Sequence, residues 1–252
     1  MTTFRLADVE VPRVGLGTNC LTTAPEHVAF VREAVAAGLR HLDTAHSYTD
    51  GDSERAIGEA LEGAAEGVLV ATKGGYGDGE GKPEVLEAQI EQSLRSLRTD
   101  AIGLYYLHRV DPETPLEESL GAIKAYVDRG AIRHVGISAV SLEQIERARQ
   151  VVPIAAVQNH YNLDEREDEH VVDYCEREGI AFVPYFPLHG SRPGVAAAAE
   201  RLGVTETTVK LAWLLQRSPA MVPIPGTLSI EHLRENLAAL ELDLGEAGDI
   251  AA

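Results

Sequence analysis

The chain has 252 residues, of which 44% are hydrophobic and 25% charged, and its formal net charge is −18. This composition is that of an ordinary globular protein long enough to bury a core. The acidic charge repels nucleic acid and anionic membranes, and no apolar run approaches the roughly 18 residues of a membrane span, so neither is an expected partner.

The chain has two cysteines, Cys20 and Cys175, and no CxxC motif. So low a content favours a reducing compartment over a disulfide-stabilised fold. The first residues also lack the apolar segment of a secretory signal. We therefore expect a cytoplasmic protein without a structural disulfide.

Short β-rich runs alternate with longer helical patterns along the whole chain. Residues 4–6 and 9–11 come first and are expected to pair as a hairpin that covers the bottom of the fold. The strand and helix pairs that follow are 13–18 with 26–37, 41–43 with 53–61, 68–73 with 83–97, 102–107 with 116–127, 133–138 with 142–151, 154–158 with 167–177, 180–185 with 205–216, and 221–225 with 230–240.

Eight successive strand–helix units predict a parallel sheet with crossover helices. In a chain of about 250 residues, that number favours closure into a (β/α)8 barrel. Helix starts are indicated by Pro25, by Pro83 and by Ser141 with Gln144 three residues later, and Gly179 indicates a helix end. Because no linker or low-complexity tract interrupts the pattern, we predict an α/β protein with one barrel domain over residues 1–252.

Most of the predicted strands end on polar residues. In chain order, the residues at the strand ends are Thr18, Asp43, Lys73, His108, Ser138, Gln158, Tyr185, Gly226 and Thr227. Barrels of this kind carry out their chemistry at the carboxyl ends of the strands. Asp43, Lys73 and His108 end three successive strands, and neighbouring strands lie about 4.8 Å apart, so these side chains can meet at one mouth. Tyr48 follows in a loop at the same mouth.

These four groups together suit proton transfer. A free tyrosine has a pKa near 10, and we expect the Lys73 cation to lower the pKa of Tyr48. Asp43 would hold Lys73 in its charged form despite burial. His108 would donate a hydrogen bond to a substrate oxygen and orient it. Since no side chain can supply a hydride, reduction would require a cofactor.

Other roles for the same residues have to be weighed. Asp43 and Lys73 could form a structural ion pair, His108 could be a buried structural histidine, and Tyr48 could serve packing alone. A metal-dependent hydrolase would take its ligands from Asp43, His46, His108, His134 and His160. Against that reading, Lys73 between Asp43 and His108 would repel a cation.

Six strings of this sequence resemble those of the aldo-keto reductases. They are Gly15–Thr18, Leu42–Tyr48, Ala71–Lys73, Leu104–His108, Ile132–Ser138 and Pro223–Thr227. Order and spacing agree over nearly the whole chain, from about Val11 to Leu240. The resemblance implies a (β/α)8 barrel and NAD(P)H-dependent reduction of aldehydes or ketones. It also implies a catalytic tetrad made of Asp43, Tyr48, Lys73 and His108.

The resemblance further implies a binding site for NADPH, with NADH as a possible substitute. Ser138 and Gln158 would contact the nicotinamide carboxamide, and Tyr185 would stack on the nicotinamide ring. Leu188 would lie along the pyrophosphate. The remaining cofactor contacts would come from Thr18, Gly226, Thr227, His232, Arg234, Glu235 and Asn236.

The sequence departs from the family pattern at three cofactor positions. Members commonly carry Ser-Asn where this chain has Ser138-Ala139, so one carboxamide contact is lost. Many have a lysine at the position of Gly226 and an arginine at that of His232, and those cations contact the 2′-phosphate. We therefore predict a preference for NADPH over NADH of less than about 100-fold.

The segment after residues 102–107 is short, and only about a dozen residues follow Leu240. We expect an open pocket with modest selectivity, favouring activated aldehydes or dicarbonyls over simple ketones. The resemblance leaves one rival from another class, a cofactor-sensing regulatory barrel in which turnover is incidental. The expected partner is a small carbonyl substrate, and the expected assembly is a monomer.

Overall fold

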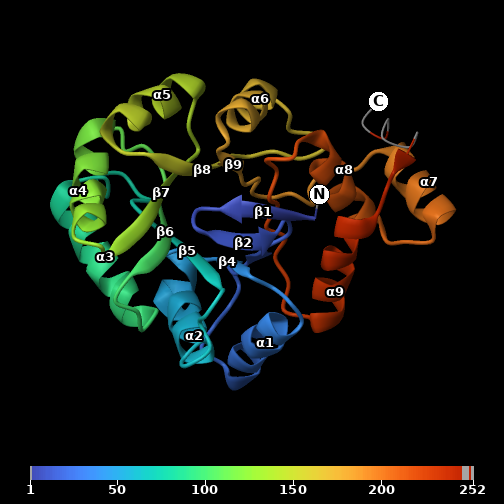
Figure 1. The fold of residues 1–252 in the computed structure, drawn as a ribbon, viewed down its shortest axis with the longest axis horizontal. Helices are drawn as coiled ribbons and strands as arrows, with labels where there is room; N and C mark the ends of the chain where they lie inside the picture. The colour runs from blue at the N-terminus through green and yellow to red at the C-terminus, as the bar shows by residue number, and fades with distance from the viewer. Residues whose placement is uncertain (1, 246–249, 251–252) are drawn as a thin grey trace.

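The computed structural model describes residues 2–245 and 250. Its main sheet is parallel, and its strands follow one another in chain order: β3 (Leu16–Gly17), β4 (His41–Asp43), β5 (Leu69–Gly74), β6 (Ile102–Leu107), β7 (Ile132–Ser138), β8 (Ile154–Gln158) and β9 (Ala181–Phe182). In Figure 1 the helices surround these strands in the same order. The predicted α/β architecture is confirmed.

The helices of the outer layer alternate with the strands along most of the chain. They are α1 (Pro25–Ala36), η1 (Tyr48–Gly51), α2 (Asp52–Ala60), α3 (Pro83–Ser96), α4 (Leu116–Asp128), α5 (Leu142–Val151), α6 (Glu169–Glu178), α7 (Pro193–Leu202), α8 (Glu206–Arg217), α9 (Ile230–Ala238) and η2 (Ala239–Glu241).

The segment 221–225 closes the barrel between β9 and β3. On one side the Val222 amide donates to the Phe182 carbonyl at 2.9 Å; on the other, the Gly15 amide donates to the Pro223 carbonyl at 2.9 Å and the Gly17 amide to the Pro225 carbonyl at 3.2 Å. The segment forms only isolated bridges. Because Pro223 and Pro225 have no amide hydrogen, a regular ladder cannot form. The eighth predicted strand is therefore correct in position but is not a regular strand.

The local signals at helix ends behave as their chemistry requires. Pro25 and Pro83 stand at the first turns of α1 and α3. At the start of α5, the Ser141 hydroxyl accepts from the Gln144 amide and the Gln144 side chain accepts from the Ser141 amide, which is a capping box. Gly179 ends α6 in the left-handed conformation at φ 68°. Each of these predictions is confirmed.

The hairpin of β1 (Thr3–Leu6) and β2 (Val9–Pro12) covers the end of the barrel opposite the strand ends that carry the polar residues. Its strands pair antiparallel, and it lies across the centre of the ring in Figure 1. Leu6 and Val11 are fully buried in the cluster that fills the barrel, where Leu69 lies at the start of β5. The hairpin therefore excludes water from the amino-terminal end of the barrel.

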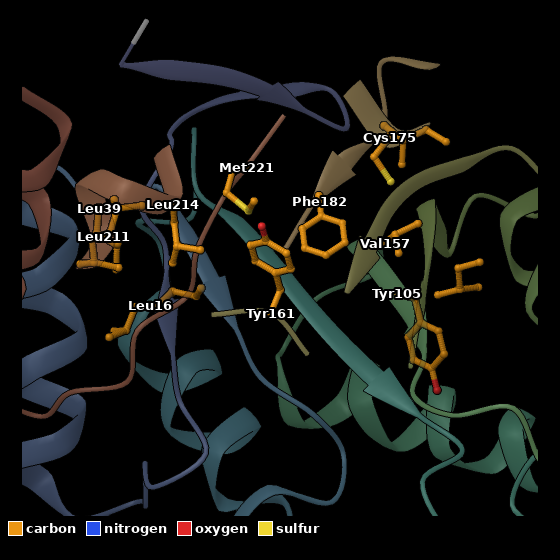
Figure 2. Packing of buried hydrophobic residues seen from close by; sticks show 14 of the residues in the cluster. Leu16, Leu39, Tyr105, Val157, Tyr161, Cys175, Phe182, Leu211, Leu214 and Met221 are labelled. Carbon is orange, nitrogen blue, oxygen red and sulfur yellow. The ribbon is translucent and has the colours of Figure 1, made fainter. Parts of the chain in front are cut away.

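A second, larger core lies between the sheet and the helices. Figure 2 shows Tyr161 and Phe182 beside each other with Met221 next to them. The Tyr161 ring meets Phe182 edge-on at 5.7 Å and stacks on Trp213 of α8 at 6.0 Å. This packing ties α8 to β9, which holds the segment 221–225 that follows α8 against the sheet.

Two sequence-based expectations need correction. Helix α7 was not expected, although Pro193 at its first turn, an alanine-rich run and Gly203 at its end are helix signals. Strand β3 is shorter than the expected 13–18; before it, the Arg13 amide donates to the Thr2 carbonyl and the Gly15 amide to the Pro223 carbonyl, so neither pairs with β4. Cys20 and Cys175 are free thiols, as predicted. Among the described residues, no helix is long and apolar enough to cross a membrane.

Candidate active site

Three members of the predicted tetrad line a cavity of about 750 Å³ at the carboxyl ends of the strands. Asp43 ends β4, His108 follows β6, and Tyr48 begins η1. Lys73, near the end of β5, lies beneath them with no exposed surface. The topology therefore brings all four groups to one mouth, because parallel strands present their carboxyl ends on one side.

Asp43 and Lys73 form a buried ion pair. The Lys73 ammonium donates to Asp43 Oδ1 at 2.5 Å and to the Thr44 carbonyl at 2.6 Å. Asp43 Oδ2 accepts a hydrogen bond from the side-chain amide of Gln158 at 2.9 Å. Burial acts to lower the pKa of Lys73, but Asp43, with a smaller contribution from Tyr48, raises it above its ordinary value. Lys73 therefore stays charged in the barrel.

The Lys73 ammonium lies 5.1 Å from the centre of the Tyr48 ring. We expected this cation to lower the pKa of Tyr48. It does act in that direction, but burial of the phenol is the larger effect, and the pKa of Tyr48 lies above its ordinary value. The expectation is thus wrong for the net shift, because it took account of the charge and not of desolvation. A phenol with a raised pKa keeps its proton at neutral pH.

A strained turn fixes the position of Tyr48. Thr49 and Asp50 have left-handed backbone angles, with φ of 48° and 54°, and Gly51 follows at φ 81°. The Thr49 hydroxyl donates to the Leu21 carbonyl at 2.6 Å and accepts from the Ser53 amide. Such strain persists only where neighbouring contacts enforce it, and it concentrates at functional sites.

His108 is neutral at physiological pH. Burial, together with the nearby cations of Lys73 and Arg109, lowers its pKa to about 3. Its Nδ1 atom is buried without a hydrogen-bond partner among the described residues. The ring meets Tyr48 edge-on at 6.0 Å and Tyr76 at 4.8 Å. A neutral imidazole in this position can donate a hydrogen bond to a carbonyl oxygen without competing with Tyr48 as an acid.

Six of the predicted cofactor residues line the same cavity. They are Thr18, Ser138, Gln158, Tyr185, Leu188 and Gly226. The hydroxyl of Thr18 is already engaged, since it donates to the Asp43 carbonyl at 2.9 Å and shares a hydrogen bond with Ser53. Tyr185 has one face covered by His160, which stacks on it at 5.2 Å. The Phe186 ring meets Tyr185 edge-on at 5.4 Å.

The predicted contacts at the adenosine end lie farther out. Gly226 and Thr227 line a smaller adjoining cavity of about 290 Å³. On α9, the His232 amide donates to the Ser229 cap, and Arg234 lies 3.6 Å from Glu33. Asn236 is buried, and the Glu235 carbonyl accepts from Thr208. His232, Arg234, Glu235 and Asn236 line neither cavity.

Sequence reasoning missed several cavity residues that are aromatic or cationic. They are Tyr76, Arg109, His160, Phe186 and His189. His160 was considered only as a metal ligand. The sequence does contain one signal that could have identified these residues, which is their position. Each of them lies within a few residues of a predicted strand end. The stacking of Phe186 on His189 at 4.7 Å depends on a positive φ of 52° at Phe186, which no sequence pattern indicated.

The suggested metal ligands do not converge. Lys73 and Gln158 already engage both carboxylate oxygens of Asp43. His134 instead lies 3.4 Å from Asp8 of the hairpin. Within the described part of the chain, no three of the side chains that commonly ligate metals come together.

The mouth of this (β/α)8 barrel holds a tyrosine above a buried lysine–aspartate pair, beside a neutral histidine. This arrangement is typical of barrel oxidoreductases that act on carbonyl groups. The model of the aldo/keto reductase family matches residues 13–194 and 192–250. The chain belongs to this family and is an oxidoreductase.

Two relatives are 36% identical to the chain. One is an uncharacterized oxidoreductase of Schizosaccharomyces pombe, with 96% of this chain and 86% of the relative covered. The other is a pyridoxine 4-dehydrogenase of Escherichia coli, with 97% and 94% covered.

Two solved structures are also similar to the chain. A thermostable aldo-keto reductase in complex with the inhibitor epalrestat is 31% identical, with a TM-score of 0.91 and coverage of 100% of this chain and 98% of the other. An aldo/keto reductase of Klebsiella pneumoniae in complex with NADP and acetate is 29% identical, with a TM-score of 0.84 and coverage of 96% and 90%.

Proposed function

We propose that the protein reduces aldehyde or ketone groups to alcohols with NADPH, as an alcohol dehydrogenase or carbonyl reductase, and that Tyr48 is the proton donor. The observation that carries the proposal is the Lys73 ammonium 5.1 Å from the Tyr48 ring, held by Asp43 at 2.5 Å. A structural ion pair would not need a phenol and a neutral histidine at the same cavity.

The cavity fits a nicotinamide cofactor. Ser138 and Gln158 would hold the carboxamide, Tyr185 would stack on the nicotinamide ring, and Leu188 would lie along the pyrophosphate. When bound, NADPH supplies the hydride that reduces the carbonyl carbon. The NADP bound in the Klebsiella pneumoniae relative supports this choice. The phosphate preference stays weak in our proposal, because Gly226 and His232 replace the usual cations.

The chain's own residues handle the proton. Tyr48 keeps its proton at neutral pH and gives it to the carbonyl oxygen, and Lys73 stabilises the phenolate that remains. Asp43 prevents Lys73 from moving toward the substrate or losing its charge. His108, being neutral, donates a hydrogen bond that orients the carbonyl.

For substrates, we propose activated aldehydes or dicarbonyls ahead of simple ketones, since the segment between β6 and α4 is short and offers few groups for selecting a substrate. The similarity to a pyridoxine 4-dehydrogenase adds pyridoxal, the aldehyde related to pyridoxine, as a specific candidate. The physiological direction follows from neither argument, so alcohol oxidation belongs in the same assay.

The test measures NADPH oxidation with a carbonyl panel for the wild type and for Tyr48→Phe, which keeps the ring and removes the proton donor. We expect kcat to fall about 10²- to 10⁴-fold, with the dissociation constant for NADPH nearly unchanged. Full activity of the variant would contradict the mechanism. Slow turnover of every carbonyl by the wild type, despite tight NADPH binding, would instead favour the regulatory-barrel alternative.

A further inference from the structure

One wall of the cavity is formed by residues that the proposed reaction does not use. Tyr76 follows β5 and Arg109 follows β6, and both line the cavity with His108. The proposed contacts to the nicotinamide carboxamide and ring lie at the ends of β7 and β8 and after β9, and Gly226 lies across the barrel beyond segment 221–225. The Tyr76–Arg109 wall therefore faces the space left for the substrate.

The cavity differs in charge from the rest of the molecule. The chain carries a net charge of −18, yet Asp43 is the one carboxylate among the residues that line this cavity. Both of its oxygens are engaged by Lys73 and Gln158. Arg109 is thus the charged group that remains available to a ligand here, and it is exposed to solvent where it borders the cavity.

The Arg109 guanidinium is positioned without being neutralised. Its Cζ atom lies 4.3 Å from the centre of the Tyr76 ring, and Nη2 donates to the Tyr76 hydroxyl at 3.2 Å. Within the described part of the chain, it forms no ion pair. A guanidinium has five N–H donors in a planar fork, so stacking on Tyr76 leaves donors for a carboxylate while restricting the motion of the side chain.

Two carboxylates near this wall in the sequence, Glu80 and Asp111, bind backbone amides. Glu80 accepts from the amides of Tyr76 and Gly77 at 3.0 and 3.1 Å. Asp111 accepts from the amides of Gly79 and Gly81, both at 3.0 Å. These bonds order the loops after β5 and β6, so Tyr76 and Arg109 rest on a stabilised support.

We propose that Arg109 binds a carboxylate of the substrate, so that the favoured substrates are aldehydes that also carry a carboxylate. This inference rests on the proposed carbonyl reduction and specifies its substrate class. The Tyr76 ring lies between the His108 ring and the Arg109 guanidinium and contacts both. Since His108 would orient the carbonyl and Arg109 would bind the carboxylate, a short chain or one aromatic ring separates these two groups in the substrate. The planar fork of Arg109 suits bidentate binding of such a group.

The experiment compares kcat/KM for 4-carboxybenzaldehyde and its neutral counterpart, methyl 4-formylbenzoate, in which a methyl ester replaces the charged carboxylate. We expect the wild type to prefer the acid by about tenfold or more, the value of one charge-assisted interaction. Arg109→Met should abolish the preference by lowering kcat/KM for the acid alone. Arg109→Lys should retain part of it, since the charge remains.

The matched control is Arg133→Met, which removes the same charge near the start of β7, at the opposite end of the barrel. It should leave the preference unchanged. A wild-type preference for the ester, or an equal loss for acid and ester in Arg109→Met, would overturn the proposal and leave Arg109 as support for Tyr76.

A binding measurement separates this inference from the proposed function. The product 4-(hydroxymethyl)benzoate is titrated into wild type and Arg109→Met in the presence of NADP. Arg109-dependent binding is expected even if neither aldehyde is reduced, in which case only the reductase proposal fails. Equal binding to both proteins would overturn the carboxylate site, whereas Tyr48-dependent turnover of the ester would still support the reductase.

Discussion

The two sides of the barrel mouth are built differently. On the side of β4, β5 and β6, Lys73 and Asp43 are fully buried and bonded to each other at 2.5 Å. On the side of segment 221–225 and α9, Gly226 has no side chain and Arg234 is exposed beside Glu33. The proposed proton-transfer residues are therefore coupled to the stability of the fold, whereas the residues proposed for the cofactor's phosphate end can change independently of it.

The contrast follows from the cost of burying charge. A buried ion pair is tolerated only when each member keeps its partner, because an unpaired charge in the interior is strongly unfavourable. An exposed ion pair contributes little, and its loss is screened by water. Substitutions should accordingly have large effects on folding at the first side and effects confined to cofactor binding at the second.

The largest effect is expected for Lys73→Met, which would leave the Asp43 carboxylate buried and unpaired. We expect the free energy of unfolding to fall by about 3–5 kcal/mol, together with loss of reductase activity. The free energy of unfolding is measured by urea denaturation, monitored by circular dichroism. The control is Lys124→Met, which breaks an exposed pair with Asp128 and should cost about 0.3–0.5 kcal/mol. Equal losses in the two variants would contradict the comparison.

A smaller loss is expected for Asp111→Asn in the support of the Tyr76–Arg109 wall. Asp111 accepts from the amides of Gly79, Gly81 and Glu113 and from the Thr114 hydroxyl. Asparagine offers one acceptor oxygen and turns donors toward amides, so we expect a loss of about 1–3 kcal/mol in unfolding free energy at pH 7.

The Asp111 effect should depend on pH with a defined sign. Burial acts to raise the pKa of Asp111, but its hydrogen bonds outweigh burial and lower the pKa to about 2. The stabilisation is therefore complete above the unfolded pKa, near 3.9, and is lost as the pH falls from there toward 2. The difference between wild type and Asp111→Asn should shrink below about pH 4. A difference that grew on acidification would contradict this assignment.

At the cofactor side, Gly226→Lys should tighten NADPH binding about tenfold, or by about 1.4 kcal/mol, with a much smaller effect on NADH. An added Cβ at Gly226 would lie at ordinary contact distances of 3.5 and 3.6 Å from Gly17 and Asn19, so the fold accepts a side chain there. Gly121→Lys adds the same charge at an open position on α4 and should change neither constant. Unchanged NADPH affinity in Gly226→Lys would contradict the proposed phosphate position.

The smallest expected effect is that of Ala139→Asn. Ala139 has a left-handed backbone at φ 54°, which asparagine tolerates better than alanine. We expect about 1 kcal/mol of added stability, measured by denaturation, and tighter cofactor binding through the restored carboxamide contact. Ala7→Asn relieves the same strain at φ 59° in the hairpin and should add stability alone. Tighter cofactor binding in both variants would argue against a specific contact at Ala139.

Sequence reasoning reached the fold because its signals are local. The alternation of apolar runs with capped helices predicted each barrel position. The strand ends pointed to Asp43, Lys73 and His108, and the family resemblance added Tyr48, in the loop after Asp43, to complete the proposed tetrad. It missed α7, whose alanine-rich segment was passed over, and it assigned a regular strand to 221–225, where two prolines interrupt the ladder. The one-domain organisation and the monomeric state stay predictions.

What the sequence by itself determined is the order of strand–helix units, the four residues proposed as the tetrad, and the absence of lysine and arginine at positions 226 and 232. The tertiary structure decided the quantities that depend on distance and desolvation. Gln158 bonds to Asp43 across 115 residues of chain, and burial outweighs Lys73 in the pKa of Tyr48. Arg109 becomes a candidate substrate-binding residue only because the fold places it on Tyr76 at a cavity with no free carboxylate among its lining residues. Sequence specifies which groups are present, but their energies depend on how the packed chain excludes water from them.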